Sequence, residues 1–211
     1  MPTPEEILTT LSLASNKFTS VSILWHVIVL VFAVFLISGK KFNTKHVSAG
    51  LSLMLLSVGI IAVLSSNPFN AIMFALAALL FGIITLKFKP EPVKLSWDFV
   101  SVAGMIMLIF GFVYPHFLID APFYKYLYAS PLGLIPCPTL SAFIGFTLLL
   151  HGFGSKKWMI TAALIGLFYG IFGVFRLKVT IDAVLIAGAA FLMVYGVLKK
   201  NNEKIRAVER N

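Results

Sequence analysis

The sequence predicts an all-α, polytopic membrane helix bundle of about seven transmembrane helices. Apolar residues make up 59% of the 211 positions and charged residues only 12%, with a mean hydropathy of +0.97. Soluble domains carry about a quarter charged residues. The apolar runs are long enough, at about 20 residues, to cross a hydrocarbon core as helices. They are continuous rather than alternating, which excludes a transmembrane β-barrel.

Seven apolar runs are the predicted spans. Asn67-Pro68 is a turn signal between the second and third, and Lys89-Pro90-Glu91-Pro92 ends the helix after the third. In chain order the spans are Ser20–Ser38, Val47–Ser66, Phe69–Leu86, Phe99–Tyr114, Pro138–Phe153, Trp158–Phe175 and Ile181–Leu198.

The segments outside the spans divide the chain into three parts. Residues 1–19 are predicted to lie in the membrane interface, because Thr3-Pro4-Glu5-Glu6 is a helix start rather than the basic start of a signal peptide. Residues 20–198 form the transmembrane bundle, with an outward loop at 115–137. Residues 199–211 form a basic cytoplasmic tail.

The basic residues predict the orientation. With seven spans, thirteen fall on one side and four on the other, and the positive-inside rule places the thirteen in the cytoplasm. The N-terminus is then outside and the C-terminus cytoplasmic. The thirteen are Lys40, Lys41, Lys45, Lys87, Lys89, Lys94, Lys156, Lys157, Lys199, Lys200, Lys204, Arg206 and Arg210; the four are Lys17, Lys125, Arg176 and Lys178.

This distribution also limits the partners. The net charge of +9 lies in short clusters between apolar runs, so it indicates membrane topology and argues against nucleic-acid binding. The expected partners are the lipid bilayer and, through helix packing, a second copy of the chain or another membrane protein. The plasma membrane of a prokaryote is the expected location, because nothing in the sequence indicates organelle targeting.

The most distinctive motif, Pro136-Cys137-Pro138-Thr139, ends the outward loop and opens the fifth span. Two prolines restrict the backbone around the only thiol of the chain. At a helix N-terminus, the dipole would favour a thiolate or metal ligation, on the outward side. Alternatively, the motif is a rigid helix start with a small buried cysteine.

The junction Leu134-Ile135-Pro136-Cys137-Pro138-Thr139 resembles that of an uncharacterised family of multipass bacterial membrane proteins. The resemblance implies a similar helical membrane fold, but it implies no activity and transfers no catalytic residues.

Six polar residues are candidates for one outward-facing pocket. His, Cys and carboxylate side chains together would suit a soft metal ion, although the spacing matches no metal motif and the sequence assigns neither a metal nor a cofactor. Alternatives remain for three of them: His26 could hydrogen bond to a neighbouring helix, His116 could be interfacial, and Arg176 could pair with Asp182. The six are His26, His116, Asp120, Cys137, Arg176 and Asp182.

Glycines of the sixth span predict close helix packing. Gly166 and Gly170 have the GxxxG spacing and Gly173 follows. The partner is either another span of this chain or a second copy of it.

Three function classes follow from these features. The first is a transporter or channel for a small solute or ion; the absence of charge near the middle of any predicted span favours a facilitator or a neutral solute. The second is a non-catalytic subunit of a membrane assembly. The third is a thiol- or metal-dependent enzyme or sensor that uses Cys137 with His26 or His116. An enzyme is the less favoured class.

Overall fold

The computed structural model describes residues 3–93 and 95–208, and side chains only as far as residue 198. Apart from one isolated β-bridge between Asn43 and Pro92, its regular structure is helical over these ranges. The α-helices are α1 (Pro4–Lys17), α2 (Thr19–Ile37), α3 (Thr44–Leu64), α4 (Pro68–Leu86), α5 (Phe99–Val113), α6 (Tyr126–Ala129), α7 (Pro136–Leu149), α8 (Lys156–Ile171) and α9 (Ala183–Val208). A π-helical turn, Phe172–Arg176, extends α8, and the 3-10 turn Thr180–Asp182 precedes α9.

Each of the seven predicted spans coincides with an apolar helix. Five of these segments are long and apolar enough to cross a membrane: Thr19–Ile37, Thr44–Leu64, Pro68–Leu86, Lys156–Arg176 and Thr180–Leu198. The other two, α5 and α7, are apolar but have only 15 and 14 residues. The fold is therefore that of a helical, multipass membrane protein, with five helices of spanning length.

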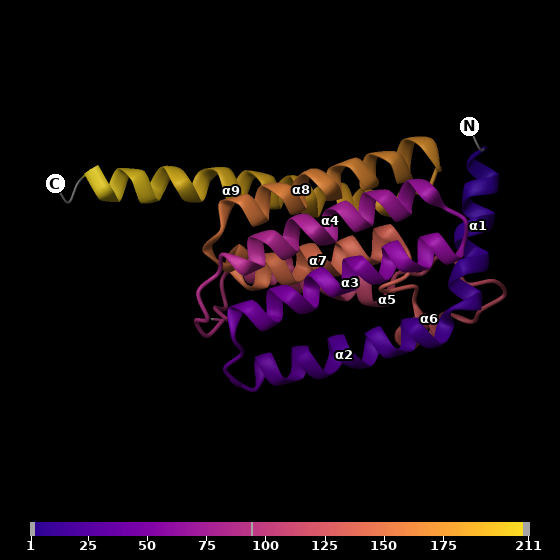
Figure 1. Ribbon diagram of the computed structural model, residues 1–211, viewed down its shortest axis with the longest axis horizontal. Coiled ribbons are helices and arrows are strands. Elements are labelled where there is room, and N and C mark those ends of the chain that lie inside the picture. Colours follow the sequence, from indigo (N-terminus) through magenta and orange to yellow (C-terminus); the bar gives the residue numbers. More distant parts are fainter. Residues whose placement is uncertain (1–2, 94, 209–211) are drawn as a thin grey trace.

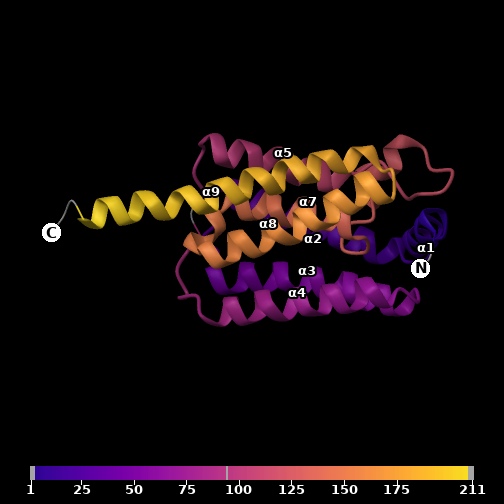
Figure 2. The same cartoon turned by 90° about the horizontal axis from the view of Figure 1, so that it is seen from above.

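Helix α7 is the centre of the bundle. All of its residues are buried, including the polar Thr139, Ser141 and Thr147. In Figure 2, α5 and α9 lie on one side of α7 and α8, while α3 and α4 form the layer on the other side. A helix that is apolar all round must be covered by protein or lipid, and here the other helices cover it.

Helices α5 and α7 meet at their backbones. A Cβ atom on Gly111 would lie 2.5 Å from the Ala142 nitrogen, and one on Gly145 would lie 2.5 Å from the Leu108 nitrogen. Gly104 makes a similar approach to Leu149, at 2.7 Å. These glycines, which the sequence analysis did not single out, allow the two short helices to lie closer together than side chains would permit.

The glycines of α8 also pack inside the chain. A Cβ on Gly166 would meet Ile144 of α7, one on Gly170 would meet Ile186 of α9, and one on Gly173 would meet Asp182. These contacts accord with the internal-packing interpretation of the GxxxG spacing.

The connections gather at the two ends of the bundle. Those that carry Lys40, Lys41, Lys87, Lys89, Lys156 and Lys157 lie at the same end, here called the basic end, where α9 also continues beyond the other helices (Figure 1). Two of them, the α2–α3 and α4–α5 connections, are joined by hydrogen bonds from Thr44 N to Glu91 O and from Val93 N to Phe42 O. These connections, which the charge count assigned to one side, therefore share one end of the bundle. Lys94 and the side chains of the basic tail 199–211 lie outside the described residues.

Helix α1 lies across the opposite end (Figure 1). Its capping box begins as the sequence indicates: Glu6 N donates to Thr3 Oγ1, and Thr3 N donates to Glu6 Oε2. Leu11 is buried, and Asn16 Nδ2 donates to Phe117 O in the loop at that end.

The 115–137 connection has two different halves. Phe123, Tyr124 and Tyr128 are exposed, as expected of an interfacial segment, whereas every residue from Ala129 to Cys137 is buried. The second half therefore folds back into the bundle. Non-helical backbone at membrane depth is tolerated where protein surrounds it.

The α5–α7 contact is tested by Gly111→Ala. The added methyl group would clash with backbone atoms that cannot rotate away, so we expect a loss of about 1–3 kcal/mol of stability. The measurement is the thermal melting temperature in detergent.

Gly82→Ala is the matched control, because Gly82 is also helical but has no heavy atom within 4 Å of an added Cβ. Its stability should stay level or rise, since alanine has the higher helix propensity. Equal melting temperatures for the two variants would contradict the backbone contact.

Candidate functional site

A buried carboxyl group, Asp182, is the centre of the most complete polar cluster at the end opposite the basic end. Its side chain is 1% exposed. Tyr114 OH donates to Asp182 Oδ1 at 2.6 Å, and Cys137 Sγ donates to Asp182 Oδ2 at 3.1 Å. Both oxygens therefore have partners, and both partners are uncharged donors.

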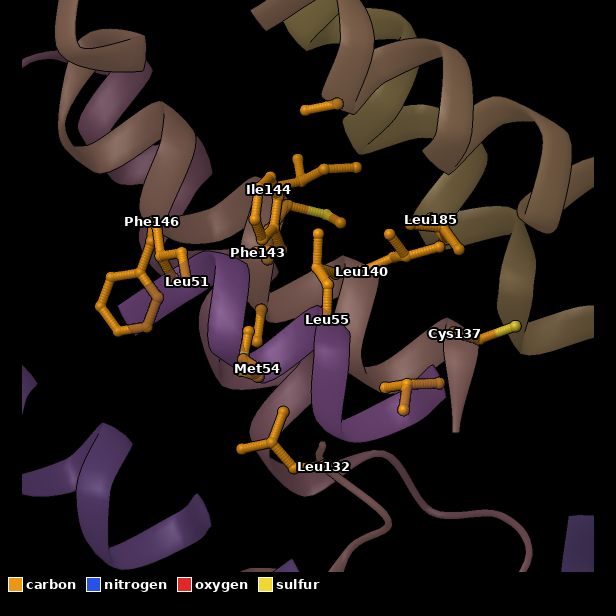
Figure 3. Packing of buried hydrophobic residues seen from close by; sticks show 14 of the residues in the cluster. Leu51, Met54, Leu55, Leu132, Cys137, Leu140, Phe143, Ile144, Phe146 and Leu185 are labelled. Carbon is orange, nitrogen blue, oxygen red and sulfur yellow. The ribbon is translucent and has the colours of Figure 1, made fainter. Parts of the chain in front are cut away.

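The Pro136-Cys137-Pro138-Thr139 motif positions the thiol. Pro136 is the first residue of α7, after Ile135 in an extended conformation, so Cys137 lies in the first turn. Thr139 Oγ1 donates to Ile135 O and accepts from Gly133 N, which ties the buried half of the loop to the helix. Figure 3 shows Cys137 at the start of α7, with its sulfur pointing toward the chain that leads into α9.

The π-helical turn after α8 makes room for the carboxyl group. A Cβ atom on Gly173 would lie 1.8 Å from Asp182 Oδ2, so no other residue fits without movement of the carboxyl group. Gly173 O also accepts from Val179 N, at the turn into α9. Single π-helical turns occur frequently at functional sites, and this one holds the backbone against a buried acid.

A second polar pair extends the cluster. Tyr169, which is buried on α8, donates through its hydroxyl to Asn70 Oδ1 at 3.0 Å. Asn70 lines a small hollow of about 10 Å³, together with Asn67 and Thr10. That volume is close to the space that one water molecule needs.

His26 belongs to a separate contact. Its Nδ1 lies 2.9 Å from Ser22 O, and its Nε2 lies 2.8 Å from Phe112 O. A neutral imidazole donates through only one nitrogen, so one of these two contacts is a true hydrogen bond when the ring is neutral. The ring links α2 to α5, which agrees with the alternative reading of His26 as a hydrogen bond to a neighbouring helix.

The other three candidates, His116, Asp120 and Arg176, differ in burial and backbone conformation. His116 is half-buried, its ring edge-on to Phe117 with the centroids 4.4 Å apart, and burial lowers its pKa. Asp120 is exposed, with a left-handed φ of +46°, and Arg176 is exposed. Among the six candidates, the structure places Cys137 and Asp182 in hydrogen-bond contact.

The positions of these side chains are relevant to two interpretations of the sequence, a metal site and a thiolate at Cys137. Within the part of the chain that the structure describes, no three His, Cys, Asp or Glu side chains are grouped so that they could hold a metal ion. For Cys137, the sequence left a thiolate and a small buried cysteine as alternatives. Cys137 is only 6% exposed and faces a carboxyl group, whose negative charge opposes loss of the thiol proton despite the helix dipole. The buried-cysteine alternative fits this geometry better.

Sequence reasoning missed Tyr114, Tyr169 and Asn70. Tyr114 is the last residue of a predicted span, a position at which tyrosine is ordinarily an interfacial anchor. The sequence signal for the cluster is a tyrosine at the end of one helix, a cysteine at the start of another, and an aspartate just before the last helix.

A further polar cluster at the basic end was also missed. His151 Nε2 lies 2.6 Å from Ser96 Oγ and 3.3 Å from Asp98 Oδ2, and its Nδ1 lies 2.6 Å from Tyr195 OH. These contacts join the segment before α5, the α7–α8 connection and α9. His151 therefore connects three segments of the chain at the basic end.

Comparison with known proteins does not assign the chain to a family. No family model, no curated protein and no solved structure matches the chain.

The hydrogen bond to Asp182 is tested by Tyr114→Phe. The variant leaves Oδ1 without its donor in a buried site, so we expect a loss of about 1–3 kcal/mol in stability. Tyr124→Phe removes a hydroxyl from a side chain that is 63% exposed and should leave the melting temperature in detergent unchanged. Equal effects would show that Tyr114 OH has no stabilising partner.

Proposed function

We propose that the protein is a membrane transporter of a small solute or ion, in which Asp182 takes up and releases a proton. The observation that carries the proposal is the burial of this carboxyl group, at the start of a candidate span, between two uncharged donors. Ionisable residues within membrane spans are costly and occur along ion pathways and proton relays.

The partners of Asp182 suit both protonation states. In the ionised state, Tyr114 and Cys137 each donate to one oxygen, and the 2.6 Å bond from Tyr114 has the length of a charge-assisted bond. In the neutral state the carboxyl proton needs an acceptor, and a hydroxyl or a thiol can act as one. Burial favours the neutral state whereas the donors favour the anion, and this balance supports reversible proton uptake.

A polar route supports access from the end opposite the basic end. It runs from the hollow beside Asn67 and Asn70 to the hydroxyl of Tyr169, which donates to Asn70. Because the hollow has room for about one water molecule, the route suits protons better than a bulky solute in this conformation. A larger solute would require movement of the helices.

Seven crossings, with the N-terminus outside the plasma membrane of a prokaryote, are part of the proposal. At 1.5 Å per residue, α5 and α7 span about 22 and 21 Å, less than a hydrocarbon core of about 30 Å. The buried segment from Ala129 to Ile135 lengthens the crossing of α7 inside the protein. In this orientation the Asp182 cluster is on the outer side.

The proposal predicts proton flux through reconstituted vesicles. Proteoliposomes that contain a pH-sensitive dye and an imposed membrane potential should acidify faster than protein-free vesicles. Asp182→Asn should lower the rate to that of protein-free vesicles, because the amide cannot carry the proton. Asp120→Asn, at an exposed carboxyl group, is the matched control and should keep the wild-type rate.

Two results would contradict the proposal. Equal rates for Asp182→Asn and the wild type would remove Asp182 from the pathway. An absence of flux for protons and for a panel of small solutes would favour a non-catalytic role in a membrane assembly. Orientation is controlled with Tyr124→Cys and Lys89→Cys in a Cys137→Ser background, where an impermeant maleimide on intact cells should label only Tyr124→Cys.

A further inference from the structure

A hollow of about 720 Å³ lies at the basic end, between α4 and the first turns of α8. We call it the α4–α8 groove. The α4 side is formed by Leu80, Ile83 and Ile84. The other residues that line it are Gly154, Lys156, Lys157, Met159, Ile160, Thr161 and Gly196.

One end of the groove carries two lysines, and the rest of its lining is mainly apolar. Lys156 and Lys157 lie at the start of α8, and among the described side chains neither of them forms an ion pair. Lys156 is partly buried and lines the groove, as expected of a lysine whose aliphatic stem packs against apolar side chains while its ammonium group stays in a polar environment. Two ammonium groups without partners favour an anionic occupant.

The apolar part of the groove runs along α4 and α8, two helices long enough to span a membrane. Leu80 and Ile83 are 49% and 44% exposed on α4. One turn farther from the lysines, Leu76 and Leu164 are also about half exposed, so the apolar strip continues along both helices. A strip in this direction is parallel to the acyl chains of a surrounding bilayer.

We propose that the α4–α8 groove binds one anionic phospholipid. Its phosphate lies between Lys156 and Lys157, and one acyl chain lies along Leu80, Ile84 and Ile160. Basic pockets between transmembrane helices on the cytoplasmic side are suited to such headgroups, and the positive-inside orientation puts these lysines on that side. The lipid site is distant from the Asp182 cluster and does not depend on proton transport.

The test is competition between two lipids with the same acyl chains, phosphatidylglycerol and phosphatidylcholine, for the full-length protein in mild detergent. Native mass spectrometry measures the lipid retained. The wild type should retain phosphatidylglycerol preferentially. Lys156→Gln with Lys157→Gln should reduce that retention by about 30-fold, about fivefold for each lysine.

Lys40→Gln with Lys41→Gln is the matched control, because it removes the same charge at the basic end from residues that do not line the groove. It should keep the wild-type preference. Ile160→Trp, which fills the apolar wall, should reduce retention of both lipids. Equal retention of the two lipids by the wild type, or equal losses in the two double variants, would overturn the proposal. Full retention by Ile160→Trp would place the lipid elsewhere.

Discussion

The enclosure of α7 is the constraint on which the rest of the structure depends. Its 14 residues are all buried, and its backbone touches that of α5 at Gly104, Gly111 and Gly145. Because lipid exerts no hydrophobic force between helices, such close packing is a principal source of association in a membrane. A helix this short can lie at the centre only if the chain before it is also buried. The segment from Ala129 to Ile135 therefore follows it into the bundle, with Thr139 closing the turn through Gly133 N and Ile135 O.

This enclosure brings the chemistry together. The first turn of α7 presents Cys137 to Asp182, the end of α5 presents Tyr114, and the π-helical turn after α8 leaves space for the carboxyl group at Gly173. The end of α5, the first turn of α7 and the π-helical turn after α8 thus meet at one acid. An unpaired buried charge is costly, so the protein stabilises the group either with these donors or with a proton. At the other end, the contacts of His151 join the segment before α5, the α7–α8 connection and α9 in a similar way, without a fully buried acid.

The sequence predicted the helices well because apolar length and turn residues are local signals. Asn67-Pro68 and the Thr3 capping box begin helices where the patterns indicate.

The site was less predictable. Cys137 and Asp182 were both candidates, yet their contact depends on a π-helical turn and on glycine packing between helices, which no local pattern encodes. His26 and Tyr114 also differ from what their positions in the sequence indicate. The deep His26 contacts backbone carbonyls instead of joining the candidate pocket, and Tyr114, at a position typical of an interfacial anchor, is completely buried. Helix orientation about its axis decides both cases, and a nearly uniform apolar surface leaves that orientation unspecified.

The central claim is that Asp182 changes its protonation state inside the protein. Infrared difference spectroscopy of the purified protein across a pH titration tests it most directly, because a protonated carboxyl group and a carboxylate absorb at different frequencies. The account predicts a carboxylic-acid band that grows as the pH is lowered, shifts in deuterated water, and is missing from Asp182→Asn but present in Asp120→Asn. Identical difference spectra for the wild type and Asp182→Asn would contradict it.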